Sequence, residues 1–502
     1  MKIKLIIFIV ILIFGYVVVD KIISAGPDSE SKIVNFLRKN IDPKIRYKIK
    51  QNLFPIARYK TLLERERISN KFLKSELYSN REEIDELRKI ISKDMIVKYR
   101  NGEIKTVPFK KENPISFKLK NFSYNLEIFD TNLLFNGKHD GALLGTSGYL
   151  EEFQNNTILV TGDGIIMNID NSNFDLEKFE ANIIRSNLTE LITDQRVYEK
   201  SDVGIKDVLI IDNEIFLSFS NNLDECFNTA IMKAEFNFEF LFFEKFFTPN
   251  DCAKKDSGEY FFNPHSSGGK MVNNEYRNIF FTHGDYYYWP APQNDNSHLG
   301  KILSINLKNQ SAEIISKGHR NPQGLYYDIN EKILISTEHG PVGGDEININ
   351  KIEDKEIKNF GWPIASYGEH HCKQKYEEMG KNGYDCSDYK LAPLHKSHSK
   401  YGFEEPIKYW VPSIGVTEIV KVPKGYLETD HGEFFVGALG NNLDEGDMSL
   451  HHLTFEKNFE KVLNENVLKI NQRIRDIKYS NKLNKILLFL ETKGSIGVLS
   501  VK

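Results

Sequence analysis

KGHRNPQGLYYDINEKILISTEHGPVGGDEININ, residues 317–350, joins a strand-and-turn pattern to polar residues that a simple strand pair does not need. The runs GLYYDI and KILIST are separated by a short polar turn, which predicts two paired strands. An ordinary hairpin needs one Gly or Asn at its turn. This segment also has His319, Arg320 and Asn321 before the first strand and a Gly-Gly-Asp-Glu run after the second. That arrangement indicates a site on a loop-rich face.

The same pairing of β-rich runs around Asp, Asn or Gly recurs along the chain. It appears in residues 156–170, 207–221, 278–288, 300–316, 432–440 and 474–492. The unit returns roughly every 40–80 residues with no long amphipathic helix between, which favours a sandwich, a barrel or a propeller. A region of roughly 390 residues is large for a sandwich and suits propeller blades with long loops.

Composition limits the class of protein. The chain has 502 residues, of which 40% are hydrophobic and 27% charged, and its net charge is -4. That length fits one large domain with extensions, and the hydrophobic share is sufficient for a core. The charge balance provides no electrostatic footprint for nucleic acid, so we expect no nucleic-acid partner.

The N-terminus begins MKIKLIIFIVILIFGYVVVDKII, with an apolar run over residues 5–19 preceded by Lys2 and Lys4. A signal-peptide core and a short membrane anchor both fit this pattern. Because Ile23 makes ISAG a poor small-x-small cleavage site, we expect residues 1–25 to be an uncleaved anchor.

Residues 26–115 are expected to form a helical spacer or stalk. Within them, residues 61–94 have apolar positions at a 4-then-3 spacing. These positions are Leu73, Leu77, Ile84, Leu87 and Ile91. A helix packed on its own domain and a self-associating stalk both fit, so a homo-oligomer stays open.

Four cysteines are present, and none belongs to a CxxC pair, which argues against zinc. Cys372 and Cys386 bracket a polar loop, and a disulfide between them would suit an oxidising compartment. Four unrelated buried thiols are the alternative. We expect the disulfide, and with it a location outside the cytoplasm.

Several motifs together resemble one family. They are GHRNPQG (318–324), EHGPVGGDEIN (338–348), NFGWPIASYG (359–368), HSSGGKM (265–271), SHLGKIL (297–303), KYWVPSIGV (408–416) and RIRD (473–476). Taken in their order along the chain, they resemble the soluble glucose/sorbosone dehydrogenases, which are aldose sugar dehydrogenases dependent on pyrroloquinoline quinone (PQQ). The resemblance implies an all-β fold, a six-bladed β-propeller over residues 116–502. It also implies PQQ and calcium at the mouth of the central channel.

The resemblance implies catalytic roles for three residues. His265 matches the general base that takes the sugar hydroxyl proton, and Asp285 matches the carboxylate that orients it. Arg320 matches a group that stabilises the developing oxyanion, and with Asn321 it would reach the quinone carbonyls. Without the other motifs, Asp285 would read as a turn residue and His265 as a loop residue.

Three more residues match cofactor contacts. Arg473 and Arg475 are two apart, so on a strand they share a face, and arginine forks suit the carboxylates of PQQ. Trp410 matches an aromatic ring that packs on the cofactor plane. A solvated face for the arginines and a core position for Trp410 are the alternatives.

The glycine-rich loop matches the calcium ligands of the family. The backbone carbonyls of Gly340 and Pro341 would hold the ion that also binds PQQ, because calcium prefers oxygen ligands. Glu346 matches a position that holds a second calcium in some relatives, together with a backbone carbonyl near Phe360.

Two positions depart from the family pattern. Gly440 stands where a cofactor lysine is common, and Asp202 stands where a glutamine near the sugar is common.

From the resemblance as a whole we expect PQQ- and calcium-dependent oxidation of an aldose to its lactone, on the periplasmic side of a bacterial inner membrane. The sugar and the electron acceptor stay open. The alternatives are a non-catalytic propeller that binds a sugar or envelope polymer, and a calcium-dependent hydrolase like the lactonases.

Overall fold

The computed structural model describes the greater part of residues 97–501. The described ranges are 97–99, 102–119, 122–131, 135–139, 142–145, 147–193, 204–256, 262–274, 277–353, 356–370, 392–423, 426–427, 432–440 and 446–501. The expected anchor (1–25), the expected helix (61–94), Asp202 and the pair Cys372–Cys386 lie outside them. Across the described ranges, no helix is both long and apolar enough to cross a membrane.

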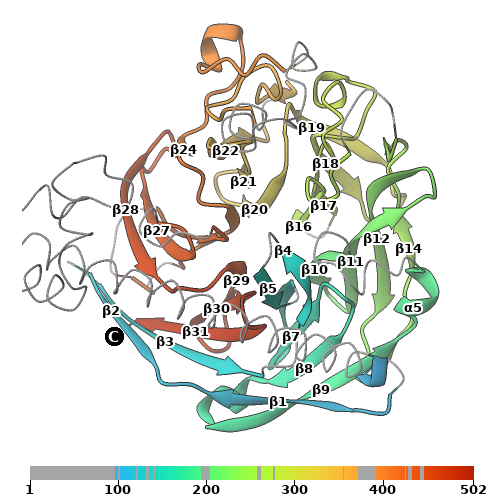
Figure 1. Ribbon diagram of the computed structural model, residues 1–502, viewed down its shortest axis with the longest axis vertical. Coiled ribbons are helices and arrows are strands. Elements are labelled where there is room, and N and C mark those ends of the chain that lie inside the picture. Colours follow the sequence, from blue (N-terminus) through green and yellow to red (C-terminus); the bar gives the residue numbers. More distant parts are fainter. Residues whose placement is uncertain are drawn as a thin grey trace, which may run out of the picture. The chain divides into compact units, whose positions relative to one another are not determined.

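The described chain is almost entirely β-structure, as the spacing of apolar runs predicts (Figure 1). Its helical elements are α5 (Leu188–Leu191), the 3-10 turns η1 (Asn171–Asp175), η3 (Ala291–Gln293) and η5 (Ser399–Tyr401), and the described helical residues 97–99.

Three sheets each contain a run of four antiparallel strands in sequence order. The first has β10 (Ile205–Ile211), β11 (Glu214–Asn222), β12 (Cys226–Glu235) and β14 (Glu244–Phe247), with β15 (Ala253–Lys254) beside β12. The second has β20 (Pro322–Asp328), β21 (Ile333–Glu338), β22 (Asp345–Lys351) and β24 (Lys408–Trp410). The third has β25 (Val416–Lys421), β26 (Gly432–Ala438), β27 (Ser449–Phe455) and β28 (Val462–Lys469).

A fourth sheet has five strands and a fifth is larger. The fourth has β16 (Gly268–Asn274), β17 (Asn278–His283), β18 (Lys301–Asn306), β19 (Ala312–Lys317) and β23 (Lys358–Asn359). The fifth runs β29 (Ile474–Ser480), β30 (Lys485–Leu490), β31 (Ser495–Val501), β3 (Ser123–Asp130), β1 (Thr106–Lys111), β9 (Lys178–Ser186), β8 (Ile166–Asp170), β7 (Asn156–Thr161) and β6 (Gly148–Phe153). β2 (Ile115–Lys118) and β13 (Phe240–Leu241) pair at its side, and β4 (Phe135–His139) pairs with β5 (Ala142–Gly145).

The first and last parts of the described region meet in the fifth sheet. β31 pairs with β3 over six residues, so the C-terminal strand completes a sheet that begins near the N-terminal side of the described region. β1 lies within the segment expected to be a helical spacer, and it pairs with β9. The β region therefore begins before the expected boundary at residue 116.

The first strand of each four-strand run faces a common centre. Each of β6, β10, β16, β20, β25 and β29 contacts the next, and β29 contacts β6, so the contacts close into a ring. In Figure 1, β10, β16, β20 and β29 lie near the centre, whereas β28 and β14 lie toward the rim.

The burial of each strand reflects its place in this arrangement. β11 and β30 are buried on both faces because neighbouring sheets pack on either side, and they read as continuous apolar runs. β28, at an outer edge, is mostly exposed or half-buried. The tight turn between β10 and β11 has Asp212 at φ 52°, a conformation that Asp tolerates well.

One disulfide links Cys226 to Cys252. Cys226 begins β12, and its strand neighbour across the sheet is Lys254 of β15. The chain returns to β12 after β14, and this return brings two cysteines 26 residues apart into bonding distance. The pair expected from the sequence, Cys372 and Cys386, lies outside the described residues.

Candidate functional site

The predicted site residues lie at one end of the ring of inner strands. His265, Arg320 and Arg473 come just before the inner strands β16, β20 and β29. Asp285 and the Gly340–Pro341 loop follow β17 and β21, whose last residues pair with the first residues of β16 and β20. Residues far apart in sequence thus share one mouth of the ring.

Hydrogen bonds connect these residues across neighbouring sheets. The backbone N–H of Asp285 donates to the Arg320 carbonyl at 2.9 Å. The Asn321 side-chain oxygen accepts from the N–H of Gly268 at 3.1 Å. Arg475 donates to Gln323 of β20 at 3.2 Å. The structure therefore brings the matched motifs into one connected group.

Asp285 is a fully buried carboxylate surrounded by donors. Its Oδ1 accepts from the Ser266 hydroxyl at 2.6 Å and from the backbone N–H of Tyr287 at 2.9 Å. Its Oδ2 accepts from the Trp362 indole N–H at 2.7 Å. Burial raises the pKa of Asp285, while Arg320 and the donors act in the opposite direction. Asp285 thus anchors the loops around the site, and its predicted orienting effect on His265 stays a prediction.

The chain bends sharply around Asp285. Tyr286 and Tyr287 both have positive φ, 51° and 68°, which is uncommon for aromatic residues. Tyr286 is buried, and its hydroxyl bonds to Thr229 at 2.7 Å. Residues 278–288 were expected to pair two β-rich runs around a Gly-Asp turn, but β17 ends at His283 and residues 284–288 form no strand. Backbone strain of this kind concentrates at functional sites.

Arg320 is clamped between aromatic rings. Its guanidinium lies 5.0 Å from the Tyr287 ring centre and 5.5 Å from that of Trp362. It donates to the Tyr287 hydroxyl at 2.8 Å and to the His339 carbonyl at 3.1 Å. Among the described residues, its Nε atom is buried and has no hydrogen-bond partner. Such an unused donor on a fixed cation is suited to a ligand oxygen.

His265 differs from its neighbours because its side chain is exposed. Its backbone N–H donates to the Asn263 side chain at 2.9 Å, which fixes the turn before β16. The next residue, Ser266, is buried and bonded to Asp285. The imidazole therefore stands at a fixed point of the mouth where a ligand could reach it. Its role as general base stays a prediction.

Arg473 and Arg475 share one carboxylate, Glu491. Arg473 Nε lies 3.4 Å from one oxygen of Glu491, and Arg475 Nε bonds the other. Burial alone would raise the pKa of Glu491, but Arg475 and Arg473 outweigh it and hold the pKa at about 2. Arg475 also lies within electrostatic reach of Asp476, and Arg473 Nη1 donates to the Leu439 carbonyl. The pair is therefore part of a buried charge network and not a solvated face, and its contact with PQQ stays a prediction.

The 338–346 loop is organised by Asp345, which the sequence analysis did not single out. The Asp345 carboxylate accepts from the N–H of Gly340 at 3.0 Å. It also accepts from the Ser413 hydroxyl and from three successive backbone amides, at 2.7–3.1 Å. A Cβ at Gly340 would lie 2.2 Å from the Gly343 carbonyl oxygen, so only glycine fits there.

The carbonyls of Gly340 and Pro341 suit a cation. No hydrogen bond between described residues uses either oxygen. Two adjacent carbonyls held by a fixed loop are oxygen ligands of the kind calcium prefers. The donor chemistry of this turn therefore fits the predicted calcium.

Trp410 packs in a hydrophobic cluster with Ile347, Ile414 and Val416. Its indole N–H donates to Glu465 at 2.9 Å, and Lys408 lies 4.7 Å from its ring centre. These contacts account for its burial, and its predicted packing on the cofactor stays a prediction. Trp362, which the sequence analysis did not name as a site residue, is the tryptophan that contacts Arg320 and Asp285.

Glu346 contacts a histidine side chain at the predicted second calcium site. Its Oε1 lies 3.4 Å from His398 Nε2, and His398 Nδ1 bonds the Phe360 carbonyl at 2.9 Å. In the described ranges, no group of three or more His, Cys, Asp or Glu side chains is placed to hold a metal. The Glu346 carboxylate and the Phe360 carbonyl both face His398, and the second calcium expected at Glu346 stays a prediction.

Position 440 also has a structural constraint. A Cβ on Gly440 would lie 2.0 Å from Cγ of Asp447. A lysine at this position would require Asp447 to move. The glycine found here is therefore matched to the position of Asp447.

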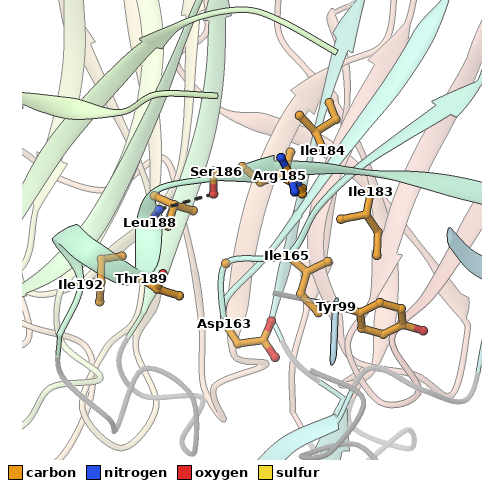
Figure 2. A pocket seen from close by; sticks show the side chains of 12 residues that line it. Tyr99, Asp163, Ile165, Ile183, Ile184, Arg185, Ser186, Leu188, Thr189 and Ile192 are labelled. Atoms are coloured by element: carbon orange, nitrogen blue, oxygen red, sulfur yellow. Dashed lines mark hydrogen bonds between the residues drawn. The ribbon is translucent and has the colours of Figure 1, made fainter. Parts of the chain in front are cut away.

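A separate pocket lies away from these residues (Figure 2). Most of its side chains are apolar, and it includes the carboxylate of Asp163 and the guanidinium of Arg185. At its edge the backbone N–H of Leu188 donates to the Ser186 hydroxyl at 3.5 Å. It contains none of the predicted site residues.

Comparison with known sequences agrees with the motifs. Aldose sugar dehydrogenase YliI of Escherichia coli (strain K12) is 28% identical over 226 residues, covering 42% of this chain and 53% of that protein. Quinoprotein glucose dehydrogenase B of Acinetobacter calcoaceticus is 33% identical over 132 residues, covering 20% of this chain and 26% of that protein. The chain thus spans about half, or less, of the length of the curated relatives it matches.

The fold is similar to a solved structure of the same class. The soluble aldose sugar dehydrogenase from Escherichia coli, in its apo-form, superposes with a TM-score of 0.55 at 21% identity. The match covers 76% of this chain and 99% of that chain. Residues 175–497, more than half of the chain, also match the family model described as glucose/sorbosone dehydrogenase. The resemblance of the motifs is therefore confirmed, and the protein belongs to the glucose/sorbosone dehydrogenase family.

Proposed function

We propose that this chain is a PQQ- and calcium-dependent dehydrogenase that oxidises an aldose sugar to its lactone. The observation that carries this proposal is the meeting, at one mouth of the strand ring, of an exposed imidazole and three positively charged guanidiniums. His265 provides the imidazole, and Arg320, Arg473 and Arg475 provide the charges. The relatives named as aldose sugar dehydrogenase and quinoprotein glucose dehydrogenase support the same substrate and cofactor class.

The residues present fit a tricarboxylate quinone. Arg473 and Arg475 place two guanidiniums beside Glu491 at the mouth, and the arginine fork suits a carboxylate of PQQ. Arg320 has an unused buried Nε donor, and Asn321 lies beside it. The carbonyls of Gly340 and Pro341 would hold calcium. When bound, PQQ supplies the quinone carbonyl that accepts the hydride from the sugar.

The chain's own groups would handle the proton and the charge. His265, exposed at the mouth, would accept the proton of the sugar hydroxyl. Arg320 is held rigidly by Tyr287 and Trp362, so its donors need no rearrangement to stabilise negative charge on an oxygen. Asp285 keeps Trp362 in place through the indole N–H.

The architecture we propose is a six-bladed propeller. The closed ring of six inner strands, each starting a run of four, supports six blades, and the fifth sheet would then contain two of them joined through β1. We further propose an oxidising location such as the periplasmic side of the inner membrane. The Cys226–Cys252 disulfide supports that compartment.

The test is a titration of the purified chain with PQQ, with and without calcium, followed by quinone absorbance and by aldose oxidation with an artificial electron acceptor. Saturable PQQ binding that needs calcium, with sugar-dependent reduction of the acceptor, is the expected result. The metal is chelated and each of calcium, magnesium and zinc is then added back. Binding restored by zinc alone, or without any metal, contradicts the proposal, as does lactone hydrolysis without sugar oxidation.

A further inference from the structure

His398 occupies the space between two oxygens that lie on different segments. Its Nδ1 bonds the Phe360 carbonyl at 2.9 Å, and its Nε2 lies 3.4 Å from the Glu346 carboxylate. Only 1% of the residue is exposed. The Tyr367 ring stacks on the imidazole with centroids 5.4 Å apart and planes 15° apart. The ring is therefore fixed in position as well as buried.

The anchoring of His398 extends to its own turn. Glu405 accepts from the Tyr367 hydroxyl and from the backbone N–H of Ser399, both at 2.8 Å. His398 thus sits between a stacked ring and the start of η5, and Glu405 ties these two neighbours together. The imidazole is therefore held in one position by its surroundings.

The two oxygens that His398 joins are the pair expected to bind a second calcium. Calcium needs six to eight oxygen ligands at about 2.3–2.6 Å. Here the imidazole lies between the two oxygens, and Asn348 lies 3.4 Å from the other oxygen of Glu346. The remaining cavity, which Glu338, Glu346, Phe360 and His398 help to line, is about 10 Å³. That is room for about one water, and too little for the further oxygen ligands that calcium needs beyond these two.

We infer that His398 takes the place of the second calcium ion, tying β22 to the segment after β23 with a side chain where a metal would otherwise join them. In this protein the Glu346 position takes no metal. The single calcium of the proposed function would then be the one at the Gly340–Pro341 turn.

A short series of contacts connects His398 to the predicted site. The Phe360 ring packs on His319 at a centroid distance of 4.9 Å, and His319 Nδ1 bonds Glu338 at 3.1 Å. The other oxygen of Glu338 accepts from the backbone N–H of Arg320 at 2.9 Å. His398 is therefore connected to Arg320 through Phe360, His319 and Glu338.

The experiment uses the full chain, freed of metal and without PQQ, so that its outcome does not depend on sugar oxidation. Bound calcium per chain and the thermal unfolding midpoint are measured with and without calcium chloride. The wild type and Glu346→Gln are expected to bind the same amount of calcium, while Glu346→Gln unfolds a few degrees lower because His398 loses its partner. One more calcium in the wild type than in Glu346→Gln would overturn the inference.

A second variant tests whether the space is a cation site that His398 fills. His398→Ala is expected to gain a calcium-dependent rise in unfolding midpoint. The matched control, Glu346→Gln combined with His398→Ala, is expected to lack that rise. An equal rise in unfolding midpoint in the two variants would show that Glu346 does not bind the added calcium, and would overturn the inference.

A third measurement needs no destabilised protein. Histidine labelled with ¹⁵N gives ring signals, and the signals of His398 are identified by their loss in His398→Gln. Calcium is expected to leave them unchanged in the wild type. A shift of these signals on calcium addition, without PQQ, would show that an ion displaces the imidazole.

Discussion

Replacing Asp285 by Asn tests whether this carboxylate holds the site together through Trp362. Asn keeps an oxygen at the Oδ1 position, where Ser266 and Tyr287 donate. At the other position it presents an NH₂ group to the indole N–H of Trp362, which now donates to Oδ2 at 2.7 Å. Two donors would then face each other in a fully buried place.

The expected cost follows from that mismatch. A buried donor without a partner costs about 1–3 kcal/mol, and hydrogen bonds to charged groups are at the upper end. We expect Asp285→Asn to lower the free energy of unfolding by about 2–3 kcal/mol. In a Trp362→Phe background the opposing donor is gone, so the same substitution should cost about 1–2 kcal/mol less.

The assay is a double-mutant cycle by urea unfolding, followed by far-ultraviolet circular dichroism. The wild type, the two single variants and the double variant are compared at one pH. Costs that add to within about 0.5 kcal/mol would refute the reasoning, because Asp285 and Trp362 would then act independently. Ser266→Ala is a matched control that removes a donor from Oδ1 without touching the indole.

Three further predictions concern the base, the arginine pair and pH. His265→Ala should retain PQQ binding and lose sugar oxidation by about 10²–10⁴-fold, and equal turnover in steady-state kinetics would reject the base. Arg473→Ala and Arg475→Ala should each weaken PQQ binding in an absorbance titration, and unchanged affinity in both would reject the cofactor contact. Burial lowers the pKa of His283 to about 4, so the unfolded state binds the extra proton below about pH 6.5. Stability should fall by up to ~3 kcal/mol as pH drops from about 6.5 to 4, and unfolding of His283→Gln should lack that slope if the histidine causes it.

The positions of the strands could be predicted because local patterns decide them. Residues 207–221 and 474–492 were expected to form strand pairs, and they form β10–β11 and β29–β30. Apolar runs interrupted by a short polar turn carry this information within about fifteen residues. His265, Asp285, Arg320 and Arg473 each lie next to the start of an inner strand or the end of its neighbour, and their roles stay predictions.

The supporting residues could not be found in the same way. Asp345, Trp362 and Glu491 act on partners that lie 5–77 positions away along the chain. Their roles depend on which loops the closed ring places together, and a single sequence holds no local signal for that. His398 is the clearest case, because its partners are a carboxylate 52 residues earlier and a backbone oxygen 38 residues earlier.

Lys270, in the HSSGGKM motif, holds together the strands around the mouth. Lys270 is buried, and its Nζ lies 2.7 Å from Asp207, 2.5 Å from Glu418 and 2.9 Å from Asp476. These carboxylates stand on three different inner strands, β10, β25 and β29. One ammonium thus gathers acidic groups from three sheets, which burial without a cation would make very costly.

Each of these carboxylates also accepts an amide of a neighbouring inner strand. Asp207 accepts from the N–H of Met271 on β16, Glu418 from Leu325 on β20, and Asp476 from Leu150 on β6. The three pairs include all six inner strands, so one lysine connects the whole ring. Two residues of this motif therefore have separate roles. Its histidine stands exposed at the mouth, and its lysine fixes the strands that set where Arg320, Arg473 and the Gly340–Pro341 turn meet.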